Sequence, residues 1–138
     1  MPAKVFFDTN VLIYAVAEND PRSAQAEELL ASGGILSVQV LNEFVAVARR
    51  KILMPWKDVT EALETFRILC PSPLSITVEM HEAALRIAEK HGYNIYDALV
   101  VAAALEAGCA TLYSEDLRNG QTIDGQLTIR NPFARSSG

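Results

Sequence analysis

The sequence predicts an α/β fold, a three-layer sandwich in which a central, mainly parallel sheet of about five short strands is flanked by helices. Two observations lead to this prediction. The expected strands are short runs of consecutive apolar residues, a pattern typical of strands buried on both faces of a parallel sheet. Segments with helical periodicity separate these runs, and such alternation favours a parallel sheet covered by helices on each side.

The first expected strand is the apolar run at residues 5–7, and Asp8 follows it directly. The next residues, Val11-Leu12-Ile13-Tyr14, are expected to begin a helix. The Asp8 carboxylate is therefore predicted to lie at the carboxyl end of a central strand, where open α/β sheets bind ligands. A simpler alternative is that Asp8 only caps the helix, because aspartate is a favoured N-cap residue. Both interpretations stay open from the sequence.

Two helices are expected around a second strand, Ile35-Leu36. Asp20-Pro21 resembles an N-cap followed by proline at the first helical position, which predicts a helix through about Leu30. Ser37 is expected to cap a longer helix from about Val38 to Lys51.

Two charged residues of this longer helix are candidates for a site. Glu43 lies just beyond the edge of the apolar arc, next to the core rather than opposite it. The alternative is a glutamate at the rim that pairs with a nearby arginine. Arg50 follows seven residues later on the same face, within reach of a phosphate bound near Glu43. Its simpler role is to complement the helix dipole at the carboxyl end.

The remaining elements are predicted from apolar spacing and capping residues. In chain order they are a helix from about Val59 to Cys70, a strand at 74–76, a helix that Thr77 caps and that runs to Gly92, a buried helix that begins near residue 95, a strand at 110–113 and an edge strand at 126–129. Residues 1–133 are expected to form a single domain, and residues 134–138 a disordered tail.

Asp97 stands out in the buried helix. It is the only ionisable side chain between Tyr96 and Glu106, in a segment that is apolar on all sides. Burying a carboxylate without partners is costly, so Asp97 is expected to be hydrogen-bonded or to bind a cation. The alternative is that it only stabilises the first helical turn through the helix dipole.

A further carboxylate, Asp116, follows the strand at 110–113, although it can also be explained as the start of a turn. In a parallel sheet Asp8 and Asp116 share one edge, and Glu43 lies near it. Asp97 can join them only if the buried helix points its N-terminus toward this edge. Four carboxylates in one place would repel each other unless a divalent cation neutralised them. Because the set contains no His or Cys, Mg²⁺ or Mn²⁺ is favoured over zinc, and these ions serve metal-dependent nucleases.

Composition limits the class of protein. Half of the 138 residues are hydrophobic, and the longest apolar run, Ala98 to Leu105, is too short to span a membrane. The two isolated cysteines match no disulfide scaffold or metal motif, and no leader pattern precedes the first strand. We therefore expect a reduced, soluble, cytoplasmic protein. The net charge of −5 argues against a protein that coats nucleic acid through charge alone.

Four segments together resemble the motifs of the PIN domain, in that family's order and over essentially the whole chain. They are Phe7-Asp8-Thr9-Asn10-Val11-Leu12-Ile13-Tyr14, Leu41-Asn42-Glu43-Phe44, Tyr96-Asp97-Ala98-Leu99-Val100-Val101-Ala102-Ala103-Ala104 and Leu112-Tyr113-Ser114-Glu115-Asp116-Leu117. The small size is similar to that of the VapC-type toxins of bacterial and archaeal toxin–antitoxin pairs.

This resemblance implies a PIN-like fold and an endoribonuclease that depends on Mg²⁺ or Mn²⁺, forms a homodimer and is inhibited by an antitoxin. The acidic quartet of the family would correspond to Asp8, Glu43, Asp97 and Asp116, and its polar helpers to Asn10, Ser37 and Ser114. Asp8, Asp97 and Asp116 would hold the metal. Glu43 would ligate it through water or orient the attacking water.

The sequence fits other classes of protein less well. An aspartyl phosphatase typically has a second acid two residues after its nucleophile, where this chain has Asn10. A non-catalytic RNA-binding module has no need of four carboxylates, which repel the phosphate backbone. An inactive PIN-like interaction module remains the main alternative. For contact with a second copy or an antitoxin, Trp56 and the helix at 59–70 are the expected surface.

Overall fold

The structure is a computed structural model and describes residues 4–134. Its elements are β1 (Val5–Phe7), α1 (Thr9–Val16), α2 (Ser23–Ala31), α3 (Val38–Arg50), α4 (Trp56–Leu69), α5 (Val78–His91), α6 (Ile95–Glu106), β2 (Thr111–Tyr113), β3 (Thr122–Ile123) and β4 (Leu127–Arg130). The predicted disordered tail lies, apart from Ala134, outside the described residues.

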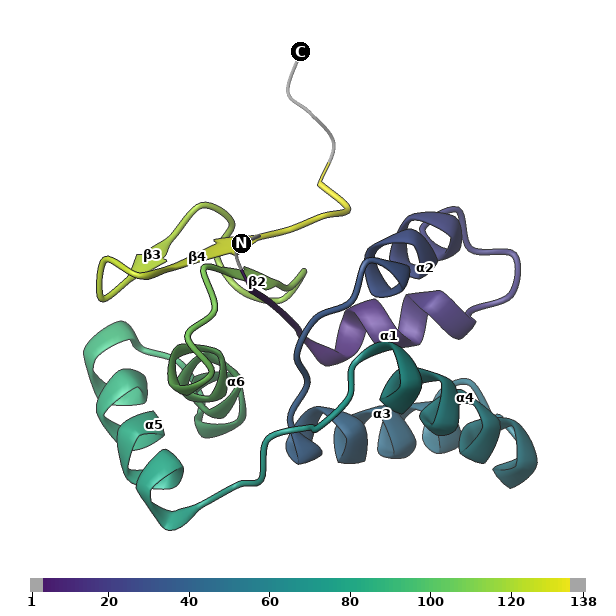
Figure 1. The fold of residues 1–138 in the computed structure, drawn as a ribbon, viewed down its shortest axis with the longest axis horizontal. Helices are drawn as coiled ribbons and strands as arrows, with labels where there is room; N and C mark the ends of the chain where they lie inside the picture. Colours follow the sequence, from purple (N-terminus) through teal and green to yellow (C-terminus); the bar gives the residue numbers. More distant parts are fainter. Residues whose placement is uncertain (1–3, 135–138) are drawn as a thin grey trace.

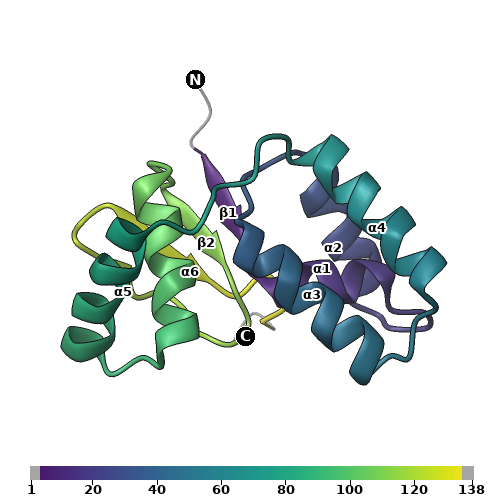
Figure 2. The same ribbon diagram turned by 90° about the horizontal axis from the view of Figure 1, so that it is seen from below.

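The sheet has the strand order β1-β2-β4-β3, in which β1, β2 and β4 are parallel and β3 is antiparallel to β4. Figure 1 shows α5 and α6 as a pair on one side of the molecule and α1 to α4 as a group on the other. Seen from below, β1 and β2 lie between these two groups (Figure 2). The predicted α/β class with a mainly parallel sheet is confirmed.

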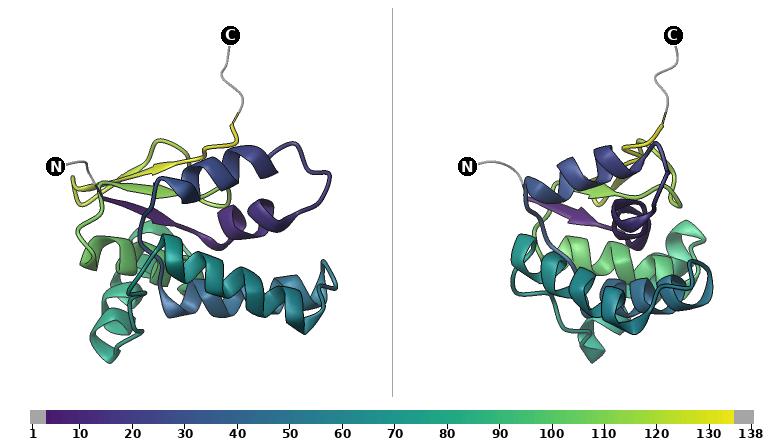
Figure 3. Two further views of the ribbon diagram at one scale, coloured as in Figure 1. Left: turned by 45° about the vertical axis from the view of Figure 1, so that its right-hand side comes forward. Right: turned by 90° about the vertical axis from the view of Figure 1, so that its right-hand side faces the viewer.

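The core lies between the sheet and the helices. Figure 3 shows α2 on the side of β2 to β4 and α3 to α6 on the opposite side, with α1 between them. Every residue of α6 from Ala98 to Ala104 is buried, which confirms the prediction of a buried helix. Phe6, Phe7, Phe44 and Leu112 are fully buried as well. No helix within residues 4–134 is long and apolar enough to span a bilayer.

The predicted count of about five strands is wrong in detail. Residues 35–36 and 74–76 form no strands and contribute only two isolated parallel bridges, Phe6 with Ile35 and Ser37 with Leu74. Each segment leads almost at once into a helix, so the ladder ends after one bridge. The antiparallel strand β3 was not predicted. It joins β4 through residues 124–126, in which Asp124 and Gly125 both have positive φ, and an Asp-Gly pair favours a hairpin turn.

The observed helix starts agree with the predicted ones where the only role of the capping side chain is to cap the helix. Ser37 accepts a hydrogen bond from the Val40 amide at 3.2 Å, and Thr77 caps α5 in the same way. The predicted cap at Asp20 is wrong, because α2 begins at Ser23 and the Asp20 carboxylate binds Arg22 instead. Helix α4 begins at Trp56, three residues before the prediction.

Candidate active site

All four predicted acids line a single cavity of about 480 Å³. They come from four different elements: Asp8 from the end of β1, Glu43 from α3, Asp97 from the first turn of α6 and Asp116 from the loop after β2. Asn10 and Arg50 line the same cavity, as predicted. The fold thus gathers side chains that are more than a hundred positions apart in the sequence.

Asp8 is buried, with 3% of its surface exposed, and both proposed roles are compatible with its position. It caps α1 by accepting a hydrogen bond from the Thr9 amide at 2.7 Å. The Ser114 hydroxyl donates to its other oxygen, also at 2.7 Å. Burial raises the pKa of Asp8 to about 6, although the bonds from Ser114 and Thr9 act in the opposite direction.

Glu43 is half-buried and faces the same cavity. Its carboxylate accepts hydrogen bonds from the Thr9 hydroxyl at 2.9 Å and from Gln39 Nε2 at 3.2 Å. Within residues 4–134 none of the ion pairs involves Glu43, so the alternative of a rim glutamate paired with arginine finds no support there. Burial raises the pKa of Glu43, and the charges of Asp97 and Asp116 raise it further.

Asp97 and Asp116 complete the acidic wall. Asp97 is half-buried and accepts a hydrogen bond from Asn94 Nδ2 at 3.0 Å, while its backbone amide donates to the same asparagine, which caps α6. Burial raises the pKa of Asp97, and the charge of Asp116 adds to this. Asp116 is exposed, and Asn10 Nδ2 donates to its Oδ2 at 3.3 Å.

The predicted polar helpers fall into two groups. Asn10 and Ser114 contact the acids directly, and Ser114 also accepts a hydrogen bond from the Asp116 amide at 3.2 Å. Ser37 is buried as the cap of α3 and does not line the cavity. Arg50 is exposed on the cavity wall next to Lys51.

Sequence reasoning left the contribution of Glu115, a fifth acid in the fourth motif, open, and this residue lines the cavity. It missed three other residues of this region: Thr9 bonds Glu43, and Tyr14 and Lys51 line the cavity. Two signals were available. Tyr14 lies one helical turn after Asn10, and Lys51 lies eight residues, about two turns, after Glu43, so each shares a helix face with a predicted site residue.

Comparison with known proteins gives the family. The model of the PIN domain matches residues 5–122. The chain belongs to the PIN-domain family. The resemblance found in the four sequence motifs is thereby confirmed for the family. No curated protein matches this PIN-domain chain at a significant level.

Solved structures agree on the fold. VapC20 from Mycobacterium tuberculosis, a sarcin-ricin loop cleaving toxin, is 22% identical with a TM-score of 0.68, over 82% of this chain and 90% of that one. A toxin–antitoxin complex from Klebsiella pneumoniae is 17% identical with a TM-score of 0.71, over 94% and 98%. VapBC2 from Rickettsia felis, bound to promoter DNA, is 20% identical with a TM-score of 0.58, over 81% and 87%.

The donors of this PIN-domain cavity suit a hard divalent cation. The four acids offer only carboxylate oxygens, the ligands that Mg²⁺ and Mn²⁺ prefer. Three of them have raised pKa values, which reflects the cost of placing several negative charges in a partly buried space. The acids surround the cavity rather than meet at one point, since within residues 4–134 no three His, Cys, Asp or Glu side chains form a group that could hold a metal ion.

Proposed function

We propose that this PIN-domain protein is an endoribonuclease that depends on Mg²⁺ or Mn²⁺ and acts as the toxin of a type II toxin–antitoxin pair. One observation carries the proposal: the four predicted carboxylates, from four elements, line one cavity together with Glu115 and two basic side chains. The likeness in fold to VapC20, a toxin that cleaves the sarcin-ricin loop, and to two toxin–antitoxin assemblies supports this choice of substrate and partner.

The residues divide into roles. Asp8, Asp97 and Asp116 would hold the ion, directly or through its bound waters, and Glu43 would reach it through water or orient the attacking water. Mg²⁺ keeps several waters and binds through one or two carboxylates and substrate phosphates, so an open arrangement of acids is suited to it. When bound, the ion would polarise the phosphodiester and make water a better nucleophile.

Neighbouring residues in and beside the cavity would position these groups and the substrate. Ser114 and Asn10 hold the acids by hydrogen bonds, and Thr9 holds Glu43. Arg50 would contact a phosphate of the RNA. Attack by water at phosphorus would release a 3′-hydroxyl and a 5′-phosphate.

We further propose a homodimer and an antitoxin that places a basic segment, such as an arginine, in the acidic cavity. A surface for such contacts is present on α4, where Trp56 is 59% exposed and Ile68 is 78% exposed. Ile68 also borders an apolar groove between α3 and α4, formed with Leu41, Val45 and Leu63. In this function the protein would act in the cytoplasm.

A second candidate is a PIN-like module without catalytic activity, which binds RNA or protein. One observation favours it: in the part of the chain that the structure describes, no three acids form a ready-made metal site. The two candidates differ in whether RNA is cut.

The deciding experiment is cleavage of structured RNA with Mg²⁺, with Mn²⁺ and with EDTA, followed by identification of the product ends. Asp8→Asn is nearly isosteric and keeps a cap for α1, so it tests the charge of the site. We expect cleavage to fall at least about a hundredfold, because at about 1.4 kcal/mol per tenfold this is the loss of a few kcal/mol of barrier lowering.

Glu28→Gln, on the exposed face of α2, is the matched control and should cleave at the wild-type rate. Wild-type cleavage by Asp8→Asn, or cleavage that persists in EDTA, would contradict the proposed function. A wild-type protein that binds RNA without cutting it would favour the inactive module.

A further inference from the structure

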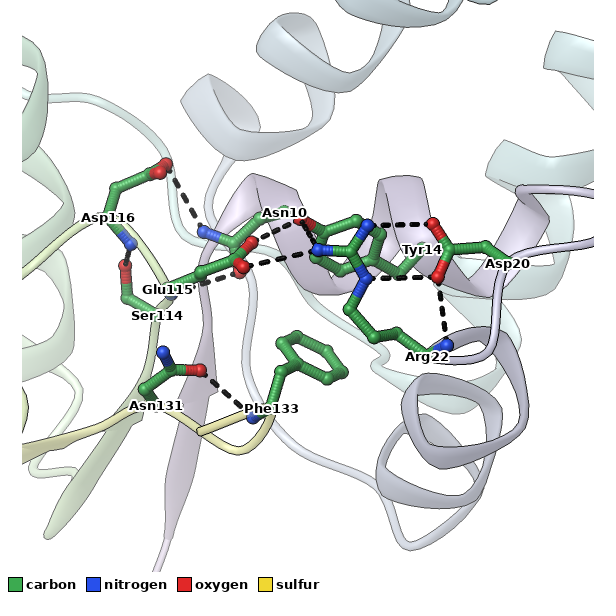
Figure 4. A network of polar contacts seen from close by, with 9 residues as sticks. All are labelled: Asn10, Tyr14, Asp20, Arg22, Ser114, Glu115, Asp116, Asn131 and Phe133. Carbon is green, nitrogen blue, oxygen red and sulfur yellow. Dashed lines mark hydrogen bonds and ion pairs between the residues drawn. The ribbon is translucent and has the colours of Figure 1, made fainter. Parts of the chain in front are cut away.

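A network of polar contacts joins α1, the start of α2 and the loop after β2 beside the acidic cavity (Figure 4). Arg22 lies over the ring of Tyr14, with Cζ 3.8 Å from the ring centroid. Its Nη1 donates to the Tyr14 hydroxyl at 2.7 Å and to Glu115 Oε1 at 3.3 Å. The Tyr14 hydroxyl in turn donates to Glu115 Oε2. Each carboxylate oxygen of Glu115 therefore has a donor.

The donors of this network are themselves held in place. Asp20 accepts from Arg22 Nε and Nη2, each at 2.9 Å, and this two-point contact orients the planar guanidinium. The Phe133 ring packs edge-on against the Tyr14 ring, with 4.9 Å between the two ring centroids. Burial raises the pKa of Tyr14 to about 12, so the hydroxyl keeps the proton that it donates.

The network reaches the acidic site through the backbone of the loop. Asn10 lies one turn before Tyr14 on α1, and its Oδ1 accepts from the Glu115 amide at 3.3 Å. Its Nδ2 donates to Asp116 Oδ2 at 3.3 Å. Two successive loop residues are thus attached to two successive turns of α1. Asp116 is exposed, so these contacts, rather than packing, limit its movement.

We propose that Arg22, Tyr14 and Glu115 form a clamp that sets the position of Asp116 in the cavity, with Glu115 as a positioning residue and not a catalytic acid. The inference rests on the proposed function of the cavity. The contrast between the two acids supports it. Both oxygens of Glu115 are engaged, whereas among the described residues only Oδ2 of Asp116 has a hydrogen-bond donor.

The first test compares Tyr14→Phe, Glu115→Gln and the double variant in RNA cleavage. Tyr14→Phe removes one hydroxyl and keeps the ring between Arg22 and Phe133. We expect kcat to fall about tenfold in each single variant, with KM within about twofold of the wild-type value. We expect the double variant to be no slower than the single variants, because both changes break the same hydrogen bond. Tyr93→Phe removes a tyrosine hydroxyl bond to Gln121, outside the cavity, and should leave kcat unchanged.

Two outcomes of this test would overturn the clamp. If the fold reduction of kcat in the double variant equals the product of the two single reductions, Tyr14 and Glu115 act independently. A large loss in Glu115→Gln with a wild-type rate in Tyr14→Phe would make Glu115 a catalytic or ligating acid.

The second test does not depend on activity. Hydrogen–deuterium exchange at the amides of residues 115 and 116 should be about tenfold faster in Tyr14→Phe and Glu115→Gln than in the wild type or Tyr93→Phe. Unchanged exchange in Tyr14→Phe would overturn the clamp, whatever happens to cleavage. If the wild type cuts no RNA, the proposed function fails, and the exchange rates still decide whether the clamp exists.

Discussion

Asp8 and Asp116 follow neighbouring parallel strands, but the protein holds them in different ways. Strand β1 runs directly into α1, so Asp8 becomes the helix cap, is 3% exposed and accepts two hydrogen bonds. Strand β2 runs into a loop, and Asp116 is exposed with a single side-chain contact, from Asn10. A helix directly after a strand holds its carboxylate by burial and capping, whereas a loop leaves its carboxylate to be held by side chains of another element. The site therefore combines a buried acid with an exposed acid that depends on contacts from α1.

The largest expected difference between the two acids appears when each is lengthened to glutamate. Asp8→Glu adds a methylene at a buried position, which should cost about 1–3 kcal/mol of folding free energy and lower cleavage at least about a hundredfold. Asp116→Glu should leave stability within about 0.5 kcal/mol and lower cleavage only about tenfold. Urea denaturation and the RNA cleavage assay measure both quantities. Equal losses of cleavage in the two variants would remove the distinction between the buried acid and the exposed one.

The dependence of stability on pH should report on the buried acid, Asp8. Burial raises the pKa of Asp8 from 3.8 to about 6, so the folded state binds a proton more tightly than the unfolded state does. The stabilisation is complete below about pH 4 and is lost as pH rises through about 6, a change of about 3 kcal/mol. Glu43 and Asp97 shift in the same direction and add to it.

Asp8→Asn should remove most of this dependence. Free energies of unfolding at pH 4.5 and pH 7.5 provide the comparison. An Asp8→Asn variant that loses as much stability between these two pH values as the wild type would show that Asp8 is not the group responsible.

The smallest effect is expected at Ser37, which lies at the same edge of the sheet after a single parallel bridge. It caps α3 and does not line the cavity, so Ser37→Ala should cost about 1 kcal/mol of stability and leave cleavage within about twofold. Thr77→Ala, which removes the equivalent cap of α5, is the matched control for stability. A fall in cleavage of tenfold or more in Ser37→Ala, but not in Thr77→Ala, would indicate that Ser37 contributes to the site, as the family resemblance implies.

Local signals in the sequence were enough for much of the fold. Apolar runs predicted β1 and β2, and hydroxyl caps predicted the starts of α3 and α5. The error at Asp20 has a physical cause, because a nearby arginine competed for the carboxylate that a helix end would otherwise use. The segments 35–36 and 74–76, expected to be strands, form only isolated bridges. The length of pairing depends on how soon each segment leads into a helix, and apolar content does not encode this.

The candidate site was predictable to the extent that each acid follows a recognisable element. That all four line one cavity depends on the order and register of β1 and β2, which pair residues far apart in the sequence. The role of Glu115 was beyond sequence reasoning. Its carboxylate is neighboured by Tyr14 and Arg22 only because α1 and α2 pack beside the loop after β2.

The pairing of β1 with β2 also bears on when the candidate site forms during synthesis. Val5 pairs with Thr111, so more than a hundred residues must leave the ribosome before this contact can form. Closing so long a loop is also slow, because the chain loses conformational entropy before the contact can stabilise it. Asp8 and Asp116 cannot line the same cavity until then. A nascent chain of this protein therefore lacks the complete acidic cavity until translation has passed β2, so the candidate site forms only at the last stage of synthesis.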